Sequence, residues 1–295
     1  MKISEKYNIK KPDSLEFLDV ELDKDNWFFI NPFYINNSND SFCIKSKPYL
    51  NSFFQDFLVQ LQDGAEDIAR ELFSHLKEIN NIRLGMSQGD PAGRGVGPLN
   101  TEMIFTAVKE TDVFNNGVIS EIGDMMVFVK YLDIDKMSDM CANIIKYELI
   151  QFTIDQCKKY NIETKEFDVD YWDVSGTTWK IGKFNLPYDK KNDYLLFVPN
   201  SLVKNEFRYS FGEFLQKFIL LFYQNKLKNE NHPKVRHIEY KNKNSKDVIT
   251  KQEVLKILKE DNIVDKKFAA DFASDNKNEY KKYKDSCLEK FKGGF

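Results

Sequence analysis

The spacing of apolar residues changes twice along this chain of 295 residues, and the change restricts the folds that the chain can adopt. Between residues 49 and 160, apolar side chains recur every three or four positions, which is the spacing of amphipathic helices. Apolar and acidic residues then alternate from Phe167 to Val174, as in a strand with one buried face. Helical spacing returns at residues 211–223. We therefore expect an α+β fold with a mixed helical layer, a small antiparallel sheet and a C-terminal helical arm.

The boundaries of the expected elements follow from turn and cap residues. Helices are expected at residues 49–61, 65–79, 101–109, 120–132, 135–160, 211–223, 251–259 and 265–291. Strands are expected at 15–22 and 27–34, as an N-terminal hairpin, and at 167–174, 177–184 and 194–198, as a central sheet packed on the helix at 211–223. A shift to basic, polar composition near Asn231 predicts a core domain at 1–230, with a basic connector and the helical arm at 231–295.

The charge of the chain argues against nucleic acid as its partner. The net charge is −3, and only five of the 43 basic residues are Arg, the side chain best suited to phosphate and guanine contacts. From Asn231 onward the chain is mildly basic, with 16 Lys and Arg against 11 Asp and Glu. The stretch at 226–246 holds seven basic residues and two Glu, which predicts a flexible, solvated linker or, as the alternative, a nucleic-acid contact.

Cysteine and histidine residues form no metal, redox or triad motif, so we expect no cofactor, no bound metal and no catalytic residue. His75 lies within an expected helix as a boundary residue, and no Gly-x-Ser-x-Gly motif is present. The N-terminus lacks the apolar run of a signal peptide, and the longest apolar run, residues 218–223, is too short to span a bilayer. Together with the unpaired cysteines, this predicts a cytoplasmic protein without a membrane partner. The cysteines are Cys43, Cys141, Cys157 and Cys287.

Five of the thirteen glycines lie between residues 85 and 97, just before an expected helix. A glycine cluster carries a large entropic cost, which indicates a loop with a specific role. Pro98 stands where a dinucleotide fingerprint needs glycine, and the Gly-Lys-Ser/Thr end of a Walker A motif is missing. We expect a structural or partner-contacting loop, with a nucleotide-binding sponge or another anion site as alternatives. The residues assigned to this loop are Gly89, Gly93, Arg94, Gly95 and Gly97.

Acidic residues near the first central strand suggest another alternative, a metal-dependent nuclease of the PD-(D/E)xK type. The candidate residues are Glu163, Lys165, Asp168 and Asp170, with Asp124 or Asp139 as the remaining carboxylate. The E-x-K triplet is common by chance in a chain with 30% charged residues, and it precedes the strand instead of lying inside it. We therefore expect these residues to form a solvated strand face.

The last expected helix, at residues 265–291, is heavily charged and has an apolar stripe too thin for a core helix. Such a stripe predicts an arm that lies on another surface or on a neighbouring subunit. The residues assigned to this contact are Phe268, Phe272, Tyr280, Tyr283 and Phe291.

The layout of the chain resembles the anti-Gabija proteins, which phages use against a bacterial defence complex. The similarity covers the whole chain and lies in its size, the glycine segment at 85–98 in a helix-rich half, the mixed middle, the Lys- and Asn-rich composition and the charged helix at 265–291. It implies inhibition by binding and not by catalysis. Several copies would assemble with each other and wrap around the nuclease and helicase subunits of a Gabija-like complex in the cytoplasm of the infected host, blocking its access to DNA.

Overall fold

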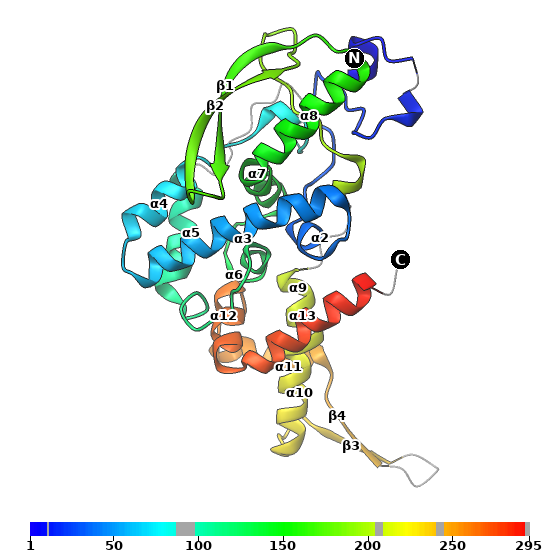
Figure 1. Cartoon of the computed structure of the whole chain (residues 1–295). Coiled ribbons are helices and arrows are strands. Elements are labelled where there is room, and N and C mark those ends of the chain that lie inside the picture. The colour runs from blue at the N-terminus through cyan, green and yellow to red at the C-terminus, as the bar shows by residue number, and fades with distance from the viewer. Residues whose placement is uncertain (11, 87–97, 204–208, 240–244, 293–295) are drawn as a thin grey trace. The chain divides into compact units, whose positions relative to one another are not determined.

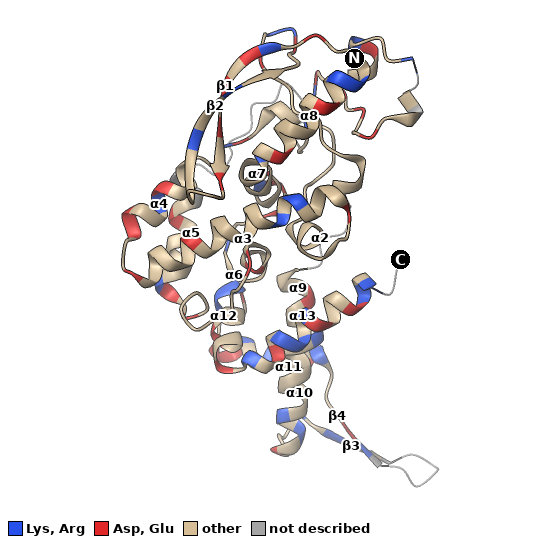
Figure 2. Ribbon diagram, viewed as in Figure 1, with Lys and Arg blue, Asp and Glu red and all other residues tan. Residues whose placement is uncertain are grey.

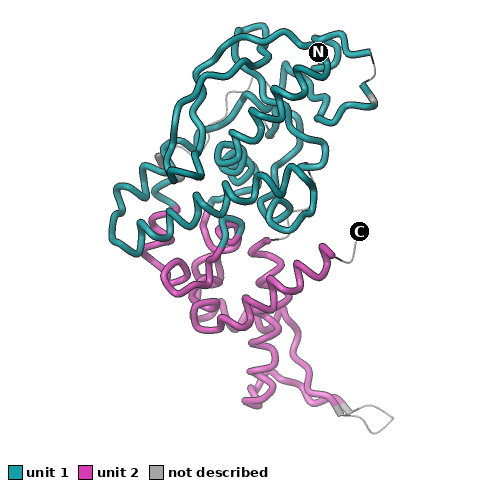
Figure 3. Tube along the Cα trace, in the orientation of Figure 1, with its two compact units in different colours: residues 1–103, 121–123, 131–207 teal, residues 104–120, 124–130, 208–295 magenta. Residues whose placement is uncertain are grey.

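A computed structural model describes residues 1–10, 12–86, 98–203, 209–239 and 245–292 of the chain (Figure 1). The chain is 56% helical, with small antiparallel sheets and a helical C-terminal region, which confirms the expected α+β class. It divides into two compact units (Figure 3). Unit 1 comprises residues 1–103, 121–123 and 131–207, and unit 2 comprises residues 104–120, 124–130 and 208–295. The boundary expected near Asn231 lies inside unit 2.

Unit 1 is built around α3, a helix of 22 residues at Ser41–Gln62. The Asp40 carboxylate caps its N-terminus by accepting from the backbone N–H groups of Phe42 and Cys43. The sequence predicted a later start, directly after Pro48, but the cap begins the helix two turns earlier and the helix runs through this proline. The other α-helices described in unit 1 are α1 (Ile3–Lys6), α2 (Pro32–Asn37), α4 (Glu66–Ser74), α7 (Ile134–Ile144) and α8 (Lys146–Tyr160), and α5 (Pro98–Glu110) begins in it.

A two-stranded antiparallel sheet packs against α3, α7 and α8 of unit 1. Its strands are β1 (Lys165–Asp173) and β2 (Thr178–Leu186), close to two of the positions expected from the sequence. Gly182 in β2 lies under two aromatic rings, because a Cβ at this position would come within 2.9 Å of Phe184 and 3.1 Å of Tyr171. A residue without a side chain therefore lets these rings cross the middle of the sheet.

The N-terminal hairpin expected at residues 15–34 does not form. Its backbone groups bond instead with distant parts of unit 1: the N–H of Leu18 donates to the carbonyl of Val198, and the N–H of Asn26 donates to that of Arg83. Helix α2 forms where the second expected strand would end. The side chain of Asn31 caps this helix, and a proline occupies its first turn. The prediction was wrong because a local pattern of apolar residues does not reveal bonds with remote segments.

The third central strand, expected at residues 194–198, is also absent. Residues 195–198 are buried, but their backbone groups find partners outside any sheet. The N–H of Leu196 donates to the carbonyl of Asn81, and the N–H of Phe197 donates to the hydroxyl of Thr153. These hydrogen bonds pair backbone N–H groups that would bond to a neighbouring strand if this segment were part of a sheet.

Unit 2 contains one continuous helical stretch that changes type twice along its length. Its middle is a π-helical turn, in which each hydrogen bond spans one residue more than in an α-helix. Aromatic rings fill the core beside it: the ring of Phe214 lies 5.2 Å from those of both Tyr280 and Tyr283. The parts of this stretch are α9 (Phe211–Phe214), the π turn η5 (Leu215–Ile219) and α10 (Leu220–Asn229).

An antiparallel hairpin begins in the basic stretch that was predicted to be a flexible linker and extends just beyond it. Its strands are β3 (Arg236–Glu239) and β4 (Ser245–Val248), and Lys or Arg residues occur in both (Figure 2). The pairing of His237 with Asp247, whose side chains lie 2.8 Å apart, helps to fix the hairpin register. These strands are rich in charged residues and lack the alternation of apolar and polar residues that predicts a strand, so the sequence pattern did not reveal the hairpin.

Four more α-helices are described wholly within unit 2: α6 (Met125–Phe128), α11 (Lys251–Asp261), α12 (Lys266–Asp275) and α13 (Lys277–Lys292). The helix expected at 265–291 is thus two helices, divided at Asn276. All four cysteines are buried, and none forms a disulfide. Within the described ranges, no helix combines the length and the apolar character needed to cross a membrane.

Candidate functional site

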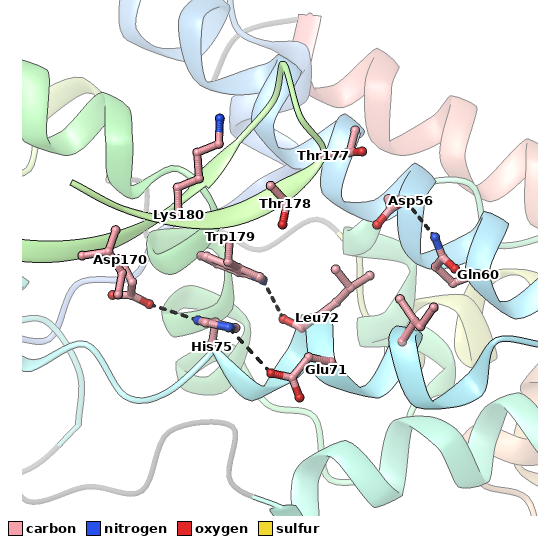
Figure 4. A pocket seen from close by; sticks show the side chains of 12 residues that line it. Asp56, Gln60, Glu71, Leu72, His75, Asp170, Thr177, Thr178, Trp179 and Lys180 are labelled. Atoms are coloured by element: carbon pink, nitrogen blue, oxygen red, sulfur yellow. Dashed lines mark hydrogen bonds and ion pairs between the residues drawn. The ribbon is translucent and has the colours of Figure 1, made fainter.

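A groove of about 430 Å³ lies in unit 1, between the helices α3 and α4 and the turn end of the β1–β2 sheet (Figure 4). One face of α4 forms one wall, because its lining residues follow the helical spacing i, i+3, i+4 and i+7. The lining residues are Asp56 and Gln60 of α3, Ile68, Glu71, Leu72 and His75 on or directly after α4, Asp170 of β1, and residues 177–181 at the start of β2.

The indole of Trp179 anchors the groove to the helices. Its Nε1–H donates to the backbone carbonyl of Leu72 at 3.1 Å. The imidazole of His75 stacks on the indole, with ring centroids 4.7 Å apart and planes 13° from parallel. The rings of Phe53 and Trp172 meet the indole edge to face. Contacts on several sides hold Trp179 in one orientation and give the groove a rigid floor.

An ion pair that includes the groove residue Asp170 joins β1 to α8. The Lys146 ammonium, whose side chain is 4% exposed, lies 2.8 Å from Oδ1 of Asp170, and His75 Nδ1 lies 3.4 Å from Oδ2. Burial raises the pKa of the Asp170 carboxyl, but the charge and hydrogen bonds of Lys146 and His75 lower it, and the net pKa lies below the ordinary value. Burial lowers the pKa of Lys146, and Asp170 opposes that effect. Asp170 is therefore an ionised group already bound on both oxygens.

Apolar side chains project from two sides of the groove. Ile68 is 55% exposed and Ile181 is 75% exposed, although both are large aliphatic residues. Two carboxylates, Asp56 and Glu71, also line the groove, and within the described part of the chain neither forms an ion pair with Lys or Arg. The groove thus offers apolar surface and negative charge to a binding partner.

The residues assigned to the glycine loop, Gly89, Gly93, Arg94, Gly95 and Gly97, lie outside the described residues. Its partner-contacting role stays a prediction. Gly85, at its edge, is described and has φ +141°, a conformation that favours glycine.

Only one of the nuclease candidates contributes to the groove. Asp170 lines it, whereas Lys165 bonds to Asn192 at 3.1 Å. Asp139 is buried, and burial together with nearby Asp135, Glu78 and Asp25 raises its pKa to about 8. Across the described ranges, no group of three or more His, Cys, Asp or Glu is arranged to hold a metal ion.

The residues expected to face a partner from the C-terminal arm lie mostly in the core of unit 2. Phe272, Tyr280 and Tyr283 are buried, and Phe268 and Phe291 are half-buried. The stripe that looked thin in the sequence is completed by aromatic residues of α9 and η5. In this conformation, the three buried rings are not available to another molecule.

His75 was expected to be a boundary residue, and its role in the groove was not predicted. A signal for it exists in the sequence, because Ile68, Glu71, Leu72 and His75 share one helix face that mixes apolar and ionisable residues. The stacking with Trp179 has no such signal, since the two rings are 104 positions apart.

A family model described as "Domain of unknown function (DUF8370)" matches residues 8–210 of the chain. All residues that line the groove fall within this match. No curated protein and no solved structure matches the sequence significantly.

Proposed function

We propose a binding function for this chain, which belongs to the DUF8370 family and carries its groove within the region that matches the family model. The chain would act by covering a surface of another protein, without catalysing a reaction. The single observation that carries the proposal is the exposure of Ile68 and Ile181 on either side of a rigid aromatic floor. Exposed aliphatic residues beside a groove are typical of surfaces that bury against a partner.

The proposed target is a bacterial anti-phage defence complex of the Gabija type, as the resemblance in sequence layout implies. The chain would inhibit it stoichiometrically, as a phage protein acting in the cytoplasm of the infected cell, by blocking its access to DNA. Nothing in the proposed action requires a cofactor.

Self-assembly is part of the proposal, and a second groove, in unit 2, supports it. This groove is about 600 Å³ and is lined by Phe218, Leu221 and Phe222, of which Leu221 is 44% exposed. Opposite charges border the apolar part, including Lys226 and Glu279. A patch with both signs of charge can pair with its own copy across a two-fold axis.

The binding function is tested with the full chain and a purified Gabija-like complex. We expect co-elution in gel filtration and loss of DNA cleavage at about one inhibitor per target site. The variant Ile181→Asp should weaken binding about tenfold or more, because burying an isoleucine contributes about 1.5–3 kcal/mol. Ile263→Asp is the matched control, since Ile263 is 84% exposed in unit 2, outside the groove. Absence of a complex with the wild-type chain would refute the proposal.

The nuclease remains an alternative prediction from the sequence. Both oxygens of Asp170 already accept from Lys146 and His75, so the geometry gives metal binding there no support. Metal-dependent DNA cleavage by the purified chain, lost in Asp170→Ala, would favour the nuclease over the binding function.

A further inference from the structure

We infer that the groove of unit 1 selects a lysine or arginine side chain of its protein partner, flanked by apolar residues, an inference that rests on the proposed binding function. The occupant would be a short segment of the partner. Its cationic group would lie between Asp56 and Glu71, and its apolar neighbours would cover Ile68 and Ile181.

The charges of the lining residues leave a negative excess. Lys180 is engaged by Asp173 at 2.5 Å, and in Figure 4 its side chain extends to the side of the sheet away from His75. Asp170 is compensated by the buried Lys146. The two carboxylates of α3 and α4 that line the groove remain without a Lys or Arg partner among the described residues.

Neighbouring side chains restrict both carboxylates before any ligand binds. Asp56 is held by the Gln60 amide at 3.3 Å, and Glu71 accepts from the Ser74 hydroxyl at 3.1 Å and lies 3.9 Å from Nε2 of His75, so neighbouring side chains limit the movement of both. Both face the same groove, from α3 and from α4 (Figure 4). A cation that binds there meets two acceptors whose orientation is already restricted, which reduces the entropic cost of binding.

The apolar walls suit the rest of a lysine or arginine side chain. Both residues have long hydrocarbon stems that pack along apolar surface while the charged end stays hydrated. Leu72 and Ile68 line the groove one helical turn apart, and Ile181 faces them from the sheet. An acidic segment or a nucleic-acid phosphate would instead meet the uncompensated carboxylates, which disfavour it.

The test uses the full chain and three synthetic peptides that are blocked at both ends and differ at one position, with Lys, Gln or Glu between two leucines. The chain has three tryptophans, so the indole N–H signals in an NMR spectrum are few and can be assigned by Trp→Phe substitution. We expect the Lys peptide to shift the Trp179 signal, with a Kd about three- to tenfold lower than that of the Gln peptide at low salt. The Glu peptide should bind most weakly. Trp27, which is 68% exposed outside the groove, reports non-specific contact.

The double variant Asp56→Asn, Glu71→Gln should lose the preference for Lys over Gln and still bind both peptides through the apolar walls. Asp67→Asn, an exposed residue of α4 that does not line the groove, should keep the preference. Thermal unfolding of each variant shows whether it is folded. Equal binding of the Lys and Glu peptides, a preference retained in the double variant, or no peptide binding up to about 1 mM would each overturn the inference.

The outcome is separable from that of the proposed function. If the defence complex still binds and depends on Ile181 but not on Asp56 and Glu71, the binding function stands and the cation preference is wrong. If no complex forms while the Lys peptide binds as expected, the groove has the inferred specificity and the proposed target is wrong.

Discussion

The hydroxyl of Tyr280 donates a 2.8 Å hydrogen bond to Oδ1 of Asp124, a carboxylate with no exposed surface. Lys284 and the backbone N–H of Ser120 also bind this carboxylate. Burial, with the charge of Asp124, raises the pKa of Tyr280 well above its ordinary value, so the hydroxyl keeps its proton. The network ties α13 to the start of α6 within unit 2. Part of a helix that the sequence predicted to lie on another surface or on a neighbouring subunit is therefore tied within unit 2 to a buried charge.

Removing the carboxylate should destabilise unit 2 more than removing the hydroxyl. Asp124→Ala removes the carboxylate that pairs with the Lys284 ammonium, which is 22% exposed, and we expect a loss of about 3 kcal/mol in the free energy of unfolding. Tyr280→Phe deletes one hydrogen bond and should cost about 1–2 kcal/mol. Urea unfolding followed by circular dichroism measures both, with the exposed Lys281→Ala as the control. Equal stability of Asp124→Ala and wild type would contradict this account.

Asp139 should make unit 1 less stable as pH rises. Its folded pKa of about 8 lies above the unfolded value of 3.8, so the native state binds more protons between these values. The associated stabilisation is complete below about pH 4 and is lost as pH rises through 8. Asp139→Asn removes this loss, and we expect the variant to gain stability relative to wild type between pH 5 and pH 8. Thermal melts across this range test it, with the exposed Asp155→Asn as the control; a constant difference would show that Asp139 ionises normally.

The ion pair of Lys146 and Asp170 should show strong coupling between its members. Lys146→Met leaves Asp170 charged and half-buried without its ammonium, and we expect a loss of about 2–3 kcal/mol at pH 7. Asp170→Asn in the Lys146→Met background should recover part of that loss. A double-mutant cycle from denaturant unfolding gives the interaction energy, and a value near zero would mean that the pair contributes nothing to stability. Because Lys146 lowers the pKa of Asp170, the cost of Lys146→Met should shrink as pH falls and the carboxyl is protonated.

The cysteines should be unreactive in the folded chain. Cys43 and Cys157 have pKa values raised to about 12 by burial, and Cys141 and Cys287 are fully buried. We expect negligible labelling by a disulfide reagent at pH 8 under native conditions and four equivalents after unfolding in urea. Rapid native labelling of one thiol would locate a region that opens without global unfolding.

Much of the fold could be predicted from local patterns, and most of the site could not. The helix expected at 251–259 matches α11, where Thr250 and Glu253 form a capping box. The alternation at 167–174 matches β1. Both signals depend on residues that are close together in the sequence, so they can be read from one sequence alone.

The wrong predictions concern residues whose partners are remote. Residues 15–34 and 194–198 have strand-like patterns, but their backbone groups bond with loops and side chains far along the chain. The groove also depends on partners that are remote in sequence, since Trp179 donates a hydrogen bond to the carbonyl of Leu72, 107 positions away. Such pairs are set by how elements pack, and periodicity within one element carries no information about them.

The π turn at Leu215–Ile219 has a consequence for how this chain tolerates change in length. Such a turn stores one extra residue, so a single deletion there could be absorbed by conversion to ordinary α geometry without breaking the helix. The residues beyond the deletion would then keep their orientation, whereas the same deletion in an ordinary α-helix would rotate them by about 100° about the helix axis. Leu221 and Phe222 would keep their places in the groove of unit 2 after a deletion at the π turn, while a deletion within α10 ahead of them would turn both away from it.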